Sequence, residues 1–316
     1  MEEDAANAGT SSNPNSENSS GNRVVNVCSW GEYIDTDLID QFEEATGIEV
    51  NYQTAESNEA LYSLLKSGGA NYDVIVPSDY MIAQLIEEDM LAELNYDNIP
   101  NFEKIDDRFK NLPYDPENKY TVPYTWGTLG IIYNTTMVDE PITSWKQLWD
   151  EGIASQLALP DISVTSGPYM IEVAGKVAGV DPAENEDPAF ELIEQLADNG
   201  ATFYESSGDL ASKFELGEVS VAVCQDFDAS TITSAVDGLE YVIVPEEGSY
   251  LGINQVNITK SCKNTDLAYK FISWLISYDV QYQDAIDRVE APANMKVELT
   301  DEQAAGMCYG DAVSVS

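Results

Sequence analysis

Two loops that follow predicted strands carry the side chains best suited to binding chemistry. In the stretch NVCSWGEYI, Trp30 and Tyr33 come directly after an apolar run, where small polar residues would be enough for a turn. In the stretch PSDY, Ser78 and Tyr80 follow another apolar run in the same way. Large aromatic side chains at such positions either close the rim of a core or form the floor of a binding site.

The elements that would position these loops alternate between strands and helices. Apolar runs and amphipathic stretches predict strands at 23–29, 48–55 and 72–78 and helices at 35–47, 58–69 and 79–89. This alternation predicts an α/β fold in which a parallel sheet is flanked by helices. Because ligands of such sheets lie beyond the carboxyl ends of the strands, we expect the two aromatic loops to face one crevice.

The middle of the chain repeats the pattern. It predicts strands at 156–162, 201–206, 219–225 and 239–245, with helices at 170–179, 188–200 and 209–218 between them. A chain of 316 residues is long enough for two domains of ordinary size. A last helical element, 264–287, carries an apolar stripe that we interpret as core: Leu267, Phe271, Trp274, Leu275 and Tyr278.

Composition excludes several classes of function. The chain has 14 basic and 57 acidic residues, a net charge of −43, and therefore lacks the basic surface that nucleic acid requires. It has no histidine, which removes the commonest general base and the commonest metal ligand. No GxSxG, GxGxxG or Walker pattern is present. The sequence therefore predicts neither an enzyme nor a cofactor or metal site, and favours a hinged binder.

Four cysteines are spread along the chain without the paired spacing of a zinc site. They are Cys28, Cys224, Cys262 and Cys308. One disulfide is compatible with an extracellular protein, although Cys28 and Cys224 lie in apolar runs and are more simply explained as buried thiols.

Residues 1–22 are rich in Ser, Asn, Glu and Gly and contain too little apolar surface to fold, so we expect a disordered tether. A tether of this kind resembles the spacer behind the lipid-carrying cysteine of bacterial surface lipoproteins. Met1 would then stand in place of a removed export signal. An ordinary disordered cytosolic N-terminus is the alternative. No apolar run reaches the 18 residues of a membrane-spanning helix.

The segment from Trp30 to Trp149 resembles the polyamine-binding proteins of bacterial ABC importers, the spermidine and putrescine receptors of the extracellular solute-binding protein superfamily. The matching pieces, in order, are SWGEYI, QFEEATGIEVNYQTAESNEALYSLLKSGGANYDVIVPSDY, PYDPENKYTVPYTWGTLGIIYN and TSWKQLW. The resemblance implies a two-lobed, Venus-flytrap fold, each lobe a mixed, mostly parallel sheet flanked by helices. A solute closes the lobes by hinge motion.

The resemblance also implies how the chain divides. Lobe 1 would comprise 23–127 and 255–300, and lobe 2 would comprise 128–254 and 301–316, with hinge crossings near 124–129 and 252–255. The chain is expected to end before the last helix of the family, which would leave one usual ligand residue without a counterpart.

Family ligand positions in the first lobe fall on Trp30, Tyr33, Ser78 and Tyr80. An ammonium group over an indole or phenol ring gains about 0.5 to 2 kcal/mol of cation–π energy, and flat apolar walls suit a methylene chain. Rim packing for the two aromatic residues, and a turn or helix cap for the other two, are the structural alternatives.

The second lobe departs from the family pattern. Gln225 stands at a ligand Trp position, while Asp228 matches a carboxylate that putrescine-type receptors use, or is a helix cap. Gly252 and Asn254 stand where the family has an aromatic residue and an aspartate, and Glu290 replaces a tyrosine. Ile162 and Thr165 stand where spermidine receptors have two further acidic residues. Because a buried charge without its partner costs about 2 to 5 kcal/mol, three-ammonium spermidine fits poorly.

We therefore expect a solute-binding receptor of an ABC importer that captures a small cationic amine, with putrescine favoured, and delivers it to membrane permease subunits. A small solute that is not a polyamine is the alternative. We expect a monomer, on the extracellular face of the cell membrane through a lipid anchor or in the periplasm.

Overall fold

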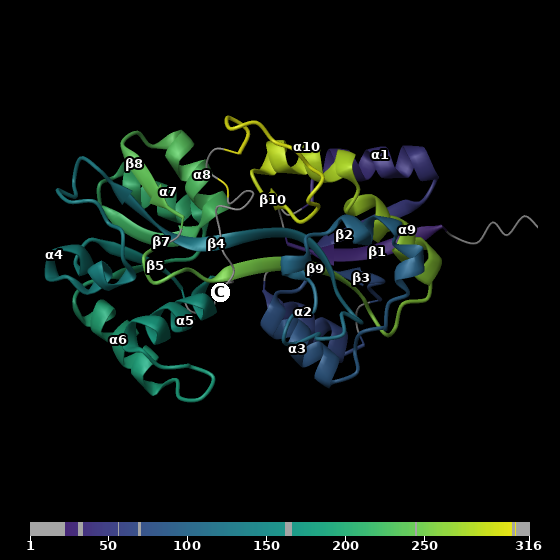
Figure 1. Cartoon of the computed structure of the whole chain (residues 1–316), viewed down its shortest axis with the longest axis horizontal. Helices are drawn as coiled ribbons and strands as arrows, with labels where there is room; N and C mark the ends of the chain where they lie inside the picture. The colour runs from purple at the N-terminus through teal and green to yellow at the C-terminus, as the bar shows by residue number, and fades with distance from the viewer. Residues whose placement is uncertain are drawn as a thin grey trace, which may run out of the picture.

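The computed structural model describes residues 23–30, 34–55, 57–68, 71–161, 166–243, 245–304 and 307. These residues form two lobes that lie side by side along the long axis of the molecule (Figure 1). The first lobe holds β1–β3 with helices α1–α3, α9 and α10, and the second holds β5–β8 with helices α4–α8. The strands β4 and β9 run across the middle, so the predicted two-lobed α/β fold is confirmed.

The strands in chain order are β1 Val24–Ser29, β2 Glu49–Thr54, β3 Val74–Ile75, β4 Val122–Asn134, β5 Leu157–Pro160, β6 Thr202–Tyr204, β7 Val221–Gln225, β8 Leu239–Val242, β9 Leu251–Ile258 and β10 Ala291–Pro292. The α-helices are α1 Thr36–Thr46, α2 Asn58–Lys66, α3 Asp79–Glu87, α4 Glu151–Ala154, α5 Gly167–Ala178, α6 Asp187–Asp198, α7 Ser207–Glu215, α8 Asp226–Ala235, α9 Thr265–Leu275 and α10 Tyr278–Arg288. Short 3-10 helices are η1 Tyr96–Asn98, η2 Pro100–Lys104, η3 Asp107–Phe109 and η4 Trp145–Trp149.

One sheet joins the two lobes. Its strand order is β2-β1-β3-β9-β4-β7-β5-β6, with β10 and β8 also paired to β4. The outer strands of each lobe are parallel, whereas the central strands β9 and β4 are antiparallel to their neighbours. Val122–Thr128 of β4 pair with β9, and the rest of the strand pairs with β7 and β8. β4 therefore changes pairing partners between Thr128 and Leu129. The residue ranges predicted for the two lobes stay a prediction.

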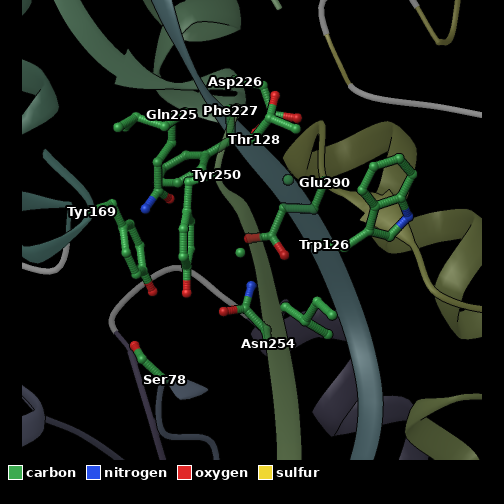
Figure 2. A pocket seen from close by; sticks show the side chains of 14 residues that line it. Ser78, Trp126, Thr128, Tyr169, Gln225, Asp226, Phe227, Tyr250, Asn254 and Glu290 are labelled. Atoms are coloured by element: carbon green, nitrogen blue, oxygen red, sulfur yellow. The ribbon is translucent and has the colours of Figure 1, made fainter. Parts of the chain in front are cut away.

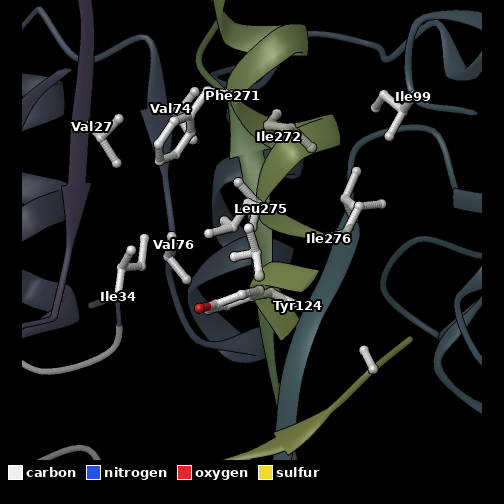
Figure 3. Packing of buried hydrophobic residues seen from close by; sticks show 14 of the residues in the cluster. Val27, Ile34, Val74, Val76, Ile99, Tyr124, Phe271, Ile272, Leu275 and Ile276 are labelled. Carbon is white, nitrogen blue, oxygen red and sulfur yellow. The ribbon is translucent and has the colours of Figure 1, made fainter. Parts of the chain in front are cut away.

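The core of the first lobe packs α9 against the sheet. Phe271, Ile272 and Leu275 point from α9 toward valines of β1 and β3, and Tyr124 closes the cluster from β4 (Figure 3). Most of the predicted stripe on the element 264–287 is therefore core. Tyr278 is the exception, because α9 ends at Leu275 and Tyr278 begins a separate helix, where it is 40% exposed.

The described cysteines are free thiols. Cys28 and Cys224 are fully buried, and Cys262 is partly buried. Burial raises the pKa of all three thiols, because the thiolate loses its hydration there. Cys308 lies outside the described residues. Within the described ranges, no helix is long and apolar enough to cross a membrane.

Candidate functional site

A pocket lies where the two lobes meet, beside the crossing strands β4 and β9 (Figure 2). It contains about 500 Å³ of space, part of it open to solvent. Its described lining residues are Ser78, Trp126, Gly127, Thr128, Leu129, Tyr169, Gln225, Asp226, Phe227, Tyr250, Gly252, Ile253, Asn254 and Glu290. Both lobes contribute to this wall, so a ligand in the pocket would touch each of them.

The first lobe contributes Ser78, which precedes α3. The Ser78 hydroxyl accepts a 3.0 Å hydrogen bond from the Asn58 amide, and the Ser78 backbone N–H donates to the same side chain at 3.0 Å. Ser57 caps α2 by accepting a hydrogen bond from the Ala60 backbone N–H, so the cap does not require the Asn58 side chain. The Asn58 side chain is consequently available to fix Ser78 at the pocket wall.

A pair of stacked tyrosines from the second lobe faces Ser78 (Figure 2). The rings of Tyr169 and Tyr250 lie 3.9 Å apart at an angle of 18°. The Tyr250 hydroxyl donates to the Asp79 carboxylate of α3, and the Tyr169 hydroxyl interacts with Ser78. Burial raises the pKa of both phenols, so they are neutral hydrogen-bonding groups. The tyrosine pair thus connects the second lobe to the first across the pocket.

Asp226 places a carboxylate in the pocket wall at the start of α8. Its side chain is 3% exposed and sits at the positive end of the helix dipole. A Cβ atom added to Gly127 would come within 3.0 Å of an Asp226 carboxylate oxygen. Glycine at 127 therefore allows β4 to pass directly against this carboxylate, which a larger residue would displace.

Glu290 places a second carboxylate in the pocket. The residue is 7% exposed, and its carboxylate is directed toward Tyr250 and Asn254 (Figure 2). The Thr125 hydroxyl favours the ionised form of Glu290 and accepts a 2.9 Å hydrogen bond from the Asn254 amide. Burial nevertheless raises the Glu290 pKa well above its usual range, and Asp284 adds to the shift.

Four of the eight residues predicted to bind ligand lie in the described lining: Ser78, Gln225, Asn254 and Glu290. Trp30, Tyr80 and Asp228 are not part of it. The Trp30 ring is buried, and Tyr80 donates a 3.1 Å hydrogen bond to Glu59 on the surface. Tyr33 lies outside the described residues, as do Ile162 and Thr165. The ligand-binding roles of all eight residues stay predictions.

The helix that carries Asp226 and Asp228 explains which carboxylate reaches the pocket. Residues two apart on an α-helix are separated by about 200° around its axis, so they face opposite sides. Asp226 faces the pocket, whereas Asp228 faces α7 and accepts a hydrogen bond from Ser207. Sequence matching favoured Asp228, and it does not register the rotation of α8 that turns Asp226 toward the pocket instead.

Sequence reasoning also missed Trp126, Tyr169 and Tyr250. Trp126 lies on β4 at the predicted crossing, and its indole N–H donates to the Pro292 carbonyl at 3.2 Å. Because Trp126 lies on a strand that was predicted to cross between the lobes, its position could have indicated that it lines the pocket. The two tyrosines come from α5 and from the residue before β9, about 80 positions apart, and no local pattern connects them.

The chemistry of the lining is that of a site for a small cation. It combines two carboxylates with neutral hydroxyl and amide groups and aromatic rings, and no described lining residue is basic. Among the described residues there is also no group of histidine, cysteine, aspartate and glutamate side chains that could hold a metal ion. A two-lobed fold with a pocket of this kind at the crossing strands defines a solute-binding receptor.

Comparison with known proteins agrees with this class. Residues 37–306 match the family of bacterial extracellular solute-binding proteins, and the chain belongs to that family. The spermidine/putrescine-binding periplasmic protein of Salmonella typhimurium is 33% identical over 264 residues, which cover 83% of this chain and 75% of that protein. The expected membership of the extracellular solute-binding superfamily is confirmed.

Two solved structures show the same architecture. The spermidine/putrescine ABC transporter substrate-binding protein of Streptococcus pneumoniae is 32% identical, with a TM-score of 0.77 and coverage of 89% of this chain and 87% of that one. An ABC transporter structure from Clostridium perfringens is 31% identical, with a TM-score of 0.76 and coverage of 91% and 90%. The chain is thus a solute-binding protein that acts on the extracellular or periplasmic side.

Proposed function

We propose that the chain captures a small cationic amine, with a putrescine-like diamine favoured, and delivers it to the membrane permease of an ABC importer. The observation that carries this proposal is the pair of buried carboxylates, Asp226 and Glu290, in a pocket whose described lining holds no basic residue. The names of the relatives, which include spermidine and putrescine, support the same ligand class.

The geometry supports a ligand with one strongly held ammonium group. Asp226 and Glu290 both line the pocket and act on each other electrostatically. The side of the pocket near Ser78 offers neutral acceptors, the Ser78 hydroxyl and the hydroxyls of the tyrosine pair that faces it. A second ammonium would interact there with oxygen lone pairs and ring faces, which contribute about 0.5 to 2 kcal/mol each in place of a full ion pair.

Calorimetric titration with putrescine, spermidine and butylamine tests this proposal, because butylamine has the carbon chain of putrescine and one ammonium fewer. We expect putrescine to bind most tightly, with butylamine weaker by about 0.5 to 2 kcal/mol, or roughly two- to thirtyfold. If none of the three amines gives heat or changes the tryptophan fluorescence at millimolar concentration, the amine assignment is wrong.

A small solute that is not a polyamine is the second candidate, and the neutral amides of Gln225 and Asn254 in the lining favour it. A solute with one amine and one polar neutral end would use both halves of the pocket. Native mass spectrometry of freshly purified protein distinguishes the two candidates, since a co-purified solute adds its own mass.

Binding rather than catalysis fits the described residues of the pocket. The Ser78 hydroxyl is held by an amide and not by a base, and the chain has no histidine. We further propose that the protein works as a monomer without nucleic acid. The polar composition of residues 1–22 supports a tether, so we propose a lipid anchor on the outer face of the membrane or a periplasmic location.

A further inference from the structure

Glu290 is one member of a buried carboxylate pair that reaches behind the pocket. Its partner is Asp284 on α10, which is 1% exposed and accepts a hydrogen bond from the Tyr124 hydroxyl. One carboxylate oxygen of each residue, Oε2 of Glu290 and Oδ1 of Asp284, has no hydrogen-bond partner. Glu290 lines the pocket, whereas Asp284 is bonded to Tyr124, which belongs to the core of the first lobe.

Anionic groups outnumber cationic groups around this pair. The titratable groups that act on it are Asp226 from α8, Arg288 from α10, Tyr124 from β4, Tyr52 from β2 and Asp35 before α1. Arg288 is the one cation of this set, and its Nε atom is buried without a hydrogen-bond partner. With Glu290, Asp284 and Asp226 all ionised, the wall would hold three buried carboxylates against one guanidinium.

Such an arrangement is unfavourable while the pocket is empty. A buried carboxylate lacks the hydration that it has in water, and nothing in the empty pocket replaces it. A neighbouring carboxylate adds repulsion. Burial raises the pKa of Asp284 to about 7 and that of Glu290 well above its usual range, so the pair retains a proton near neutral pH. The member that faces the pocket is the one whose charge a ligand could compensate.

We propose that Glu290 is uncharged in the empty receptor and releases its proton to solvent when an ammonium group enters, so that one cation replaces one proton. The proposal rests on the amine-binding function above and names how its site is regulated. The ammonium keeps all its protons and forms an ion pair with the new carboxylate. The net charge of the pocket wall plus its occupant is therefore unchanged by binding.

This exchange makes affinity depend on pH in a defined direction. Release of one proton per ligand makes the association constant rise about tenfold per pH unit, up to the apparent pKa of the carboxylate pair. Above that pKa the affinity becomes constant, because Glu290 is already ionised and an alkylamine stays protonated to about pH 10. The receptor would bind amine weakly in acidic medium and tightly in neutral medium.

Calorimetry of putrescine binding at about pH 6.5, in buffers with different ionisation enthalpies, measures the number of protons released. We expect about one proton per putrescine for the natural chain. Asp287→Asn is the matched control, because Asp287 is exposed on the same helix as Asp284, and it should release the same number. Glu290→Gln should release fewer, since the glutamine side chain has no proton to give up when the ammonium enters.

Infrared spectra provide a second readout, which begins with the empty protein. A protonated carboxyl band should be present in the natural chain and weaker in Glu290→Gln. Adding putrescine should weaken the band of the natural chain by the same amount. Binding of putrescine without proton release, or no such band in the empty protein, would overturn the exchange and leave amine binding intact. No binding by putrescine, spermidine or butylamine would remove the proposed function and the exchange with it.

Discussion

Replacing Asp284 with asparagine should change how the stability of the protein depends on pH. Asp284 is buried in α10, and burial raises its pKa from 3.8 to about 7. Between these pH values the folded protein keeps a proton that the unfolded chain releases. The free energy of unfolding therefore decreases as pH rises through this window.

The magnitude follows from the size of the shift. Each pKa unit corresponds to 1.36 kcal/mol, so a shift of about three units amounts to on the order of 4 kcal/mol. Asparagine has the same shape, cannot ionise, and can still accept the hydrogen bond from Tyr124. Asp284→Asn should consequently match the natural chain at about pH 4 and exceed its unfolding free energy by on the order of 4 kcal/mol at about pH 8.

Urea unfolding followed by circular dichroism over this pH range measures the difference. Asp287→Asn, on the exposed side of the same helix, is the control and should track the natural chain at every pH. Parallel stability curves for Asp284→Asn and the natural chain would refute the reasoning, because they would mean that Asp284 ionises in the folded protein as easily as in the unfolded one.

Three further outcomes are expected. Asp226→Asn should weaken binding of putrescine by about 2 to 5 kcal/mol in calorimetry, since it removes a buried carboxylate from the cation's surroundings; unchanged affinity would exclude that role. Tyr250→Phe should weaken putrescine binding by about 1 to 3 kcal/mol, because the Asp79 carboxylate loses a hydrogen bond that joins the lobes; equal affinity would show that this bond does not support closure. Gly175→Ala should lower the unfolding free energy by about 1 to 3 kcal/mol, because its methyl group would overlap the rigid ring of Pro182, whereas Gly152→Ala meets open space and should not; equal effects in urea unfolding would contradict the packing argument.

The sequence was sufficient for features that depend on local patterns. The alternation of apolar runs and amphipathic stretches predicted the parallel strands β1–β3 and the helices between them, and the end of β3 placed Ser78 at the crevice. Asp35 caps α1 and Gly47 ends it in the left-handed conformation, and both are residue types that these positions favour.

Features that join distant parts of the chain could not be predicted in this way. Tyr124 meets Asp284 across 160 positions, and Tyr250 meets Asp79 across 171. Which of two neighbouring aspartates enters the pocket depends on the rotation of α8, and that rotation is fixed by packing rather than by residue type. The second-lobe part of the site was therefore the part that sequence matching described least well.

The continuous sheet determines the order in which groups of the receptor contact its ligand. Gly127 of β4 and Gly252 of β9 stand directly opposite each other in the register, and both line the pocket beside Glu290 and Asp226. We expect the lobes to bend about the crossing strands β4 and β9. Groups beside these strands should therefore move little between open and closed forms. Ser78 and Tyr169, farther out on opposite lobes, would travel most. The carboxylates would then select for the charge of the ligand while the receptor is still open. Ser78 and Tyr169 would select for the length of the ligand only as the lobes close.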